Sequence, residues 1–247
     1  MSVATQATGA AAAQQAAGRR PRTNAEAARY SVLRRLAPAL KHDMVVNLQA
    51  VAMMAEVLGA RLEKGSPSPA ELEGSISKMN RLARDAVMKS LKVAAWISPA
   101  DDETVRLREG VDDCVVLLRS SFNFRGCTLA NEVPEAEFEV SQVALRNLVP
   151  AALLSLADAA AAPSDLVMTA EISTGFAVLT VRCTPRQADD GLGIDAIAVQ
   201  PGYRALDWND VQALALAEGI ELFRTQEQIV MRIPRMVATS PLQIAPV

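Results

Sequence analysis

The chain contains a single histidine, and its neighbours make it the strongest candidate for chemistry. His42 lies in the segment Lys41–Gln49, inside a long stretch with a helical apolar period. A neutral imidazole nitrogen is nucleophilic near pH 7, so an exposed histidine can accept and release a phosphoryl group. Asp43 follows directly, and we expect it to orient the ring or to hold its proton. A lone exposed histidine is more often only a solvated side chain, and this alternative stays open.

The side chains that share the histidine's side of the helix suggest a docking surface. A helix advances about 100° per residue, which places His42 opposite the apolar stripe that contains Leu40 and Leu58. The same outward sector contains Arg35, Val46, Gln49 and Met53. Val45 lies at its edge. Exposed apolar residues that group together are typical of a partner-binding surface. The basic member, Arg35, is expected to help neutralise phosphate charge.

His42 belongs to the first of two long helices. Apolar residues recur every three or four positions on both sides of Gly65-Ser66-Pro67, which ends the first helix. Ser68-Pro69-Ala70-Glu71 then has the pattern of a capping box that starts a second helix. A single hairpin of two such helices leaves both apolar stripes partly uncovered. We therefore expect a homodimer, in which residues 25–97 of two copies form a four-helix bundle.

From residue 98 onward the pattern changes to shorter elements. Helical periodicity predicts helices at residues 108–121, 141–161 and 209–218. Apolar runs bounded by turn residues predict strands at residues 104–107, 127–132, 166–172, 176–183, 220–224 and 228–233. Together these elements predict an α/β sandwich over residues 98–236, with helices on one face of a mixed sheet. Residues 1–24 and 237–247 lack a packing period and are expected to be tails, the first of them disordered. A transit peptide is the alternative for residues 1–24, which contain several arginines and no acidic residue.

Composition argues against several classes of function. In 247 residues there are 25 Lys+Arg and 28 Asp+Glu, so the net charge of −3 gives no basic footprint for nucleic acid. No apolar run reaches about 18 residues, so we expect no membrane-spanning segment. Three separate cysteines, without a CxxC pair, argue against a disulfide framework and for a reducing, cytoplasmic setting. One histidine excludes a His-rich metal site, and we expect no cofactor or metal bound by this chain itself.

The segment around the histidine resembles a known signalling family. His42-Asp43, with Leu48-Gln49 six and seven positions later, is similar to the phosphoacceptor segment of two-component sensor kinases and related phosphotransferases. That family usually has an Asn four residues after the His, where this chain has Val46 followed by Asn47. The resemblance implies a dimerising helical hairpin followed by a Bergerat (GHKL) ATPase-like α/β sandwich. It also implies response-regulator receiver domains as partners, with magnesium on the receiver.

The second half resembles the ATP-binding domain of those kinases in an eroded form. The segment Asn147–Ala152 lies where the magnesium-binding N-box is expected, but Ala151 replaces its second Asn. Asp189–Gly193 matches the D-x-G-x-G adenine box, yet no second glycine-rich segment follows it. The resemblance therefore implies a histidine phosphotransferase that shuttles a phosphoryl group between receiver aspartates through His42, without ATP. The alternatives are a divergent active kinase, or a dimeric non-enzymatic regulator that binds a kinase or a receiver.

Overall fold

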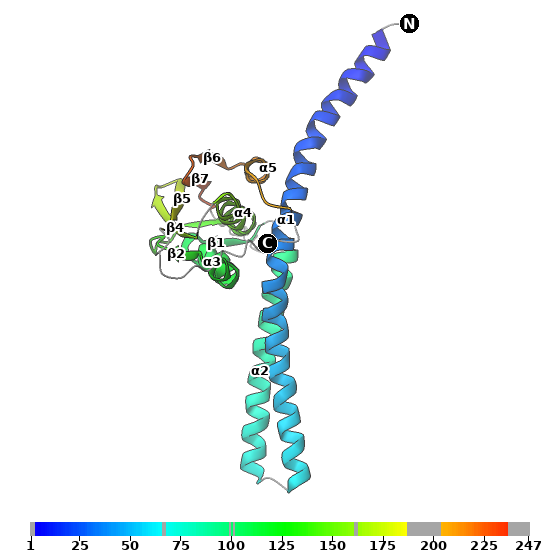
Figure 1. Ribbon diagram of the computed structural model, residues 1–247. Coiled ribbons are helices and arrows are strands. Elements are labelled where there is room, and N and C mark those ends of the chain that lie inside the picture. Colours follow the sequence, from blue (N-terminus) through cyan, green and yellow to red (C-terminus); the bar gives the residue numbers. More distant parts are fainter. Residues whose placement is uncertain are drawn as a thin grey trace, which may run out of the picture. The chain divides into compact units, whose positions relative to one another are not determined.

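The computed structural model describes residues 3–65, 68–98, 100, 102–160, 163–186 and 204–236, with side chains from residue 22 onward. The chain divides into two compact units: residues 1–35 together with 101–247, and residues 36–100. Helix α1, Val3–Lys64, runs without a break and contributes to both units (Figure 1). The first unit is therefore discontinuous in sequence, because the second unit is inserted into it.

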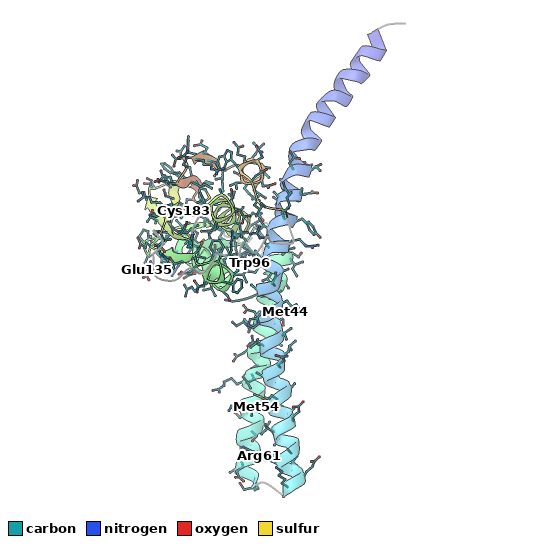
Figure 2. The ribbon with its side chains drawn as sticks, in the orientation of Figure 1. Met44, Met54, Arg61, Trp96, Glu135 and Cys183 are labelled. Atoms are coloured by element: carbon teal, nitrogen blue, oxygen red, sulfur yellow. The ribbon has the colours of Figure 1, made fainter. Side chains whose placement is uncertain are left out.

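The second unit is a helical hairpin. Its two arms are the part of α1 after Arg35 and helix α2, Pro69–Ile97, which lie side by side in Figure 1. The predicted capping box is confirmed, because the Glu71 backbone N–H donates to Ser68 Oγ at 3.4 Å and the Ser68 N–H donates to Glu71 Oε2 at 2.9 Å. Met44 and Met54, labelled in Figure 2, are half-buried members of the inner stripe of α1.

The first unit contains an α/β sandwich. Its helices are α3 (Leu107–Phe124), α4 (Gln142–Ala159) and α5 (Trp208–Glu218). Its strands are β1 (Thr104–Arg106), β2 (Thr128–Asn131), β3 (Glu139–Ser141), β4 (Ser164–Ile172), β5 (Phe176–Pro185), β6 (Glu221–Arg224) and β7 (Gln228–Pro234). Five strands form one sheet in the order β2-β4-β5-β7-β6, and β1 pairs with β3 separately. The β2–β4 pair is parallel and the other pairs are antiparallel.

The core lies between one face of this sheet and the helices. Alternate residues of β4 and β5, among them Met168 and Leu179, are fully buried, while their neighbours in sequence are half-buried or exposed. Most of α4 is buried as well, including Leu148 and Leu153. The helices cover one face of the sheet, and the other face is exposed to solvent. The expected fold class, a helical hairpin followed by an α/β sandwich, is confirmed.

Two expectations about the organisation of the chain are corrected. Residues 3–24 were expected to be a disordered tail, but their backbone is helical and continuous with the rest of α1. This segment is rich in alanine, the residue with the highest helix propensity. The unit boundary lies after Arg35 instead of at residue 25, because Ala28 and Val32 are buried in the first unit. The expected tail at 237–247 lies outside the described residues.

The length and apolar content of α1 bear on the expectation of no membrane span. Within the described residues, the helical segment Arg22–Lys64 is long and apolar enough to cross a membrane, with a mean hydropathy of 1.3 in its most apolar window. Glu56 is the only charged residue between Asp43 and Arg61, which explains this value. The expected absence of a spanning segment is therefore not confirmed.

Candidate functional site

His42 is an exposed residue in the middle of a helix. It lies on α1 within the hairpin unit, and its side chain is exposed, as the helical projection predicts. The residues that pack toward α2, among them Met44 and Val51, are half-buried. A helix interior has no unsatisfied backbone groups, so the imidazole is the reactive group that this position offers. The position leaves the ring accessible to another protein.

Four residues form a continuous ridge on the outward side of α1. His42, Val46, Gln49 and Met53 follow one another at spacings of four, three and four, which places them on one helix face. All four are exposed, with Val46 at 46% and Met53 at 58% exposure. Val45, at 38%, borders this ridge. The structure therefore brings together these predicted partner-binding residues, and we call them the His42 face.

Asp43 and Asn47 are linked to each other through the backbone. The Asn47 side-chain Nδ2 donates to the Asp43 carbonyl oxygen at 2.6 Å. Both residues are half-buried, and this bond keeps the amide within the turn of the helix. In the described part of the chain, no hydrogen bond joins the Asp43 carboxylate to the imidazole of His42. Consecutive side chains diverge by about 100° on a helix, so the role expected for Asp43 stays a prediction.

Arg35 does not belong to the His42 face, because the structure places it in a buried ion pair, and the role expected for it toward a partner or a phosphoryl group stays a prediction. Its guanidinium donates from Nη1 to Asp158 Oδ2 and from Nη2 to Asp158 Oδ1, each at 2.9 Å. Both side chains are only 7% exposed. The helical projection cannot find this contact, because the partner carboxylate lies 123 residues away in sequence. Arg35 therefore has a structural role in the first unit.

Asp158, at the end of α4, collects further donors. Arg125 Nη2 donates to Asp158 Oδ1 at 3.0 Å, and the Leu206 backbone N–H donates to Oδ2 at 3.3 Å. Burial by itself raises the pKa of this carboxyl group, but the hydrogen bonds and positive charges of Arg35 and Arg125, with the Leu206 N–H, outweigh burial. The pKa of Asp158 is therefore lower than usual, and the carboxylate is held ionised.

Asn147, the residue that the resemblance relates to magnesium, is part of a second polar network. Its Nδ2 donates to Glu218 Oε1 at 2.9 Å, and Arg29 Nη2 donates to the same oxygen at 2.8 Å. The Glu218 side chain is 13% exposed and lies at the end of α5. These bonds hold α1, α4 and α5 together. The adenine-box match Asp189–Gly193 lies outside the described residues.

A second feature of the hairpin is an apolar groove on the side away from His42. Its volume is about 480 Å³, and it is lined from α1 by Leu48 and Val51, and from α2 by Ala83, Ala86, Val87, Ser90, Leu91 and Ala94. Leu48 is 52% exposed, and Val87 and Leu91 are each 58% exposed. A groove lined by several large, exposed apolar side chains is typical of an interaction surface.

Other chemistry-bearing residues are part of the packing. Cys114, Cys127 and Cys183 are all buried, and burial raises the pKa of the Cys114 thiol strongly. No group of three or more metal-ligating side chains occurs among the described residues. The basic residues of α2 give no signal in the apolar period, although a count of charges reveals them. Between residues 78 and 92 there are five basic residues and one acidic residue.

Comparisons with known proteins give weak structural likenesses. No family model and no curated protein matches the sequence. The catalytic domain of histidine kinase ThkA aligns with 54% of this chain and 95% of its own, at 13% identity and a TM-score of 0.41. A histidine kinase from Burkholderia phymatum aligns over 81% and 97%, at 16% identity and a TM-score of 0.40.

A third solved structure, described as a bacterial phosphotransferase, aligns with 80% of this chain and 93% of its own. Its identity to this chain is 21% and the TM-score is 0.33. All these scores lie below 0.5, so we base the function on the residues of this chain.

Proposed function

We propose that this chain is a histidine phosphotransferase of a two-component phosphorelay, which shuttles a phosphoryl group between receiver-domain aspartates through His42 without binding ATP. The observation that carries the proposal is the exposed imidazole at the head of the His42 face. An exposed nucleophile bordered by Val46 and Met53, both also exposed, suits transfer from a docked protein domain. A small phosphate donor would need a concave site.

The proposed step is a reversible transfer between a carboxylate and an imidazole. The unprotonated ring nitrogen of His42 attacks the phosphorus of a receiver aspartyl phosphate. The nitrogen–phosphorus bond forms while the acyl oxygen–phosphorus bond breaks, and the receiver aspartate leaves as a carboxylate. The aspartate of a second receiver then attacks the phosphohistidine, and the ring nitrogen leaves. Neither step needs an oxidant or a reductant, and the magnesium that neutralises the phosphoryl oxygens comes from the receiver.

The polar network around Asn147 supports transfer without ATP. The amide of Asn147 is bonded to Glu218, and Ala151 has no oxygen to offer a metal ion. Arg29 adds a positive charge to the same carboxylate. A divergent active kinase would have to rearrange these bonds before a magnesium nucleotide bound on α4.

The apolar groove of the hairpin supports dimerisation. In a single copy, Val87 and Leu91 are exposed although they are large and apolar. A second hairpin would cover the groove and complete a four-helix bundle. The His42 face lies on the other side of the inner stripes, so dimerisation leaves it free for a receiver. We place the dimer in the cytoplasm, where receiver domains occur.

The proposal is tested by supplying phosphate from two sources. One arm contains the purified chain with magnesium and labelled ATP. The other contains the receiver domains encoded in the same genome, each already phosphorylated with acetyl phosphate. His42→Gln is the inactive variant, and Lys41→Ala, which changes an exposed neighbour, is the matched control.

Each outcome separates the alternatives. Label that arrives from a receiver, persists in Lys41→Ala and is lost in His42→Gln supports the phosphotransferase. Label that arrives from ATP alone overturns it in favour of the kinase. Receiver binding without any transfer, unaffected by His42→Gln, overturns it in favour of the regulator.

A further inference from the structure

The most basic part of the hairpin lies on α2. Lys78, Arg81, Lys89 and Lys92 fall within an arc of about 80° on the helix, counted at about 100° per residue. All four are exposed, and Asp85 is the one acidic residue in the same arc. In the part of the chain that the structure describes, Lys78, Arg81 and Lys89 form no ion pair. With Asp85 among them, the four basic side chains leave an excess of three positive charges in this arc, in a chain whose net charge is −3.

This basic arc lies on the same side of the hairpin as His42. The apolar groove marks the opposite side, because Val51 lines it from α1 and Val87 lines it from α2. On α2 the basic arc falls beyond the buried stripe of Ala86 and Val93, away from the groove. On α1 the His42 face points mostly away from α2, and Val46 and Met53 within it lean to the side away from the groove. The groove on one side of the hairpin is therefore lined mainly by apolar residues, whereas the other side combines an imidazole, apolar residues and positive charge.

The basic arc also reaches the level of the imidazole along the hairpin. The turn lies between Lys64 and Pro69, and both arms rise by about 1.5 Å per residue, so residue 91 is roughly level with His42. Lys89 and Lys92 lie on either side of that level. Lys78 and Arg81 lie three to four turns nearer the hairpin turn, at about the level of Met53.

We propose that Lys78, Arg81, Lys89 and Lys92 form an electrostatic docking surface for the acidic phosphorylation pocket of a receiver domain. The inference rests on the proposed function and names the part of the hairpin that recognises the partner. An aspartyl phosphate carries about two negative charges, and the carboxylates that hold its magnesium add more. A basic arc beside the nucleophile attracts such a pocket and raises the association rate. The apolar residues of the His42 face then supply short-range contact.

The test separates docking from chemistry. The probe is the receiver domain that phosphorylates the wild-type chain fastest, used as its aspartyl phosphate. Rapid quench measures the second-order rate constant and the maximal rate at saturating receiver. Arg81→Glu/Lys89→Glu is expected to lower the second-order constant at least ten-fold at 50 mM salt and leave the maximal rate within two-fold. At 0.5 M salt the difference should nearly vanish, because the Debye length falls to a few ångströms.

A matched variant controls for total charge. Arg119→Glu/Arg182→Glu makes the same change in net charge on exposed residues of the α/β unit, and it should transfer at the wild-type rate. A wild-type rate in Arg81→Glu/Lys89→Glu overturns the docking surface and leaves transfer through His42 intact. An equal loss in both double variants, or a loss that persists at 0.5 M salt, also overturns it. If no receiver phosphorylates the wild-type chain, the proposed function fails and the docking surface fails with it.

Discussion

Arg35 and Asp158 form a bidentate ion pair in which both side chains are only 7% exposed. The pair joins α1 to the end of α4, and Arg125 adds a second positive charge to the same carboxylate. Two guanidinium groups and one backbone N–H surround one buried anion. Such an anion is stable only while its donors remain, so the packing of the N-terminal helix depends on this carboxylate.

Loss of the Asp158 charge should destabilise the protein. Asp158→Asn leaves Arg35 without its anion in a buried position, and we expect the free energy of unfolding to fall by about 3 kcal/mol. Glu137→Gln is the control, since it breaks an exposed ion pair with Arg106 and should leave stability almost unchanged. Urea denaturation followed by circular dichroism measures both. Equal losses in the two variants would show that the buried pair has no special role.

The same carboxylate should make stability sensitive to acid. The pKa of Asp158 is lowered because Arg35, Arg125 and the Leu206 N–H outweigh the effect of burial. The folded state therefore binds this proton more weakly than the unfolded chain does, so the stabilisation is complete above about pH 4 and is lost below it. The stability difference between wild type and Asp158→Asn should be constant from pH 8 to 5 and shrink below pH 4. A difference that grows on acidification contradicts this assignment.

Gly110 should not tolerate a side chain. A Cβ at this position on α3 would lie 2.4 Å from Leu145 Cδ1 and 2.8 Å from Val105 Cγ1. Leu145 is buried and has little room to move, so Gly110→Ala should cost about 1–3 kcal/mol of stability. Gly59→Ala is the matched control, because its Cβ would meet no atom within 4 Å. That change should stabilise by about 0.5–1 kcal/mol. Thermal unfolding of both variants measures the contrast.

A negative charge on the groove side of the hairpin should impair dimerisation, whereas the same charge on the His42 face should impair phosphotransfer. Val87→Glu puts a carboxylate in the apolar groove and should shift the protein from dimer to monomer in sedimentation-velocity experiments. Met53→Glu puts the same charge on the His42 face and should leave the dimer intact. Phosphotransfer from a receiver should slow in Met53→Glu, because a negative charge repels the aspartyl phosphate. If Met53→Glu dissociated the dimer, the His42 face would be the dimer interface and the groove would be free for a partner.

The cysteines should be unreactive in the folded protein. Cys114, Cys127 and Cys183 are buried, and burial raises the pKa of Cys114 and of Cys183. Thiolate is the reactive form, so a thiol-specific chromogenic reagent should modify none of them at pH 8. All three should react after unfolding in guanidinium. Rapid modification under native conditions would show that the cysteines open locally.

Much of the α/β unit was predictable, because its elements are bounded by strong local signals. Helix α5 begins with a capping box in which Asp207 and Asp210 bond each other's backbone N–H groups. It ends at Gly219, whose φ of 67° suits glycine. The turn at residues 173–175 separates β4 from β5, which pair in register. The short strand β3 was missed, although β1, which is equally short and pairs with it, was predicted.

The exposure of His42 was also predictable, because the spacing of apolar residues along a helix indicates which of its sides is buried. The role of Arg35 was not, since its partner Asp158 lies on another helix and no spacing rule connects them. A signal was present in the alanines of the first helix. Ala25 and Ala28 precede Val32 at helical spacing, and all three are buried. This second stripe indicates that the N-terminal part of α1 packs separately from the hairpin.

The division of the chain has a consequence for its synthesis on the ribosome. The hairpin, residues 36–100, is made entirely between the two halves of the unit that contains Arg35 and Asp158. Its local contacts can form while the chain is still growing, since helical elements need few distant partners. Arg35 emerges early but meets its carboxylate only after more than a hundred further residues have been translated. The nascent chain therefore carries an unpaired arginine and an uncovered apolar stripe until the second part of this unit has been translated.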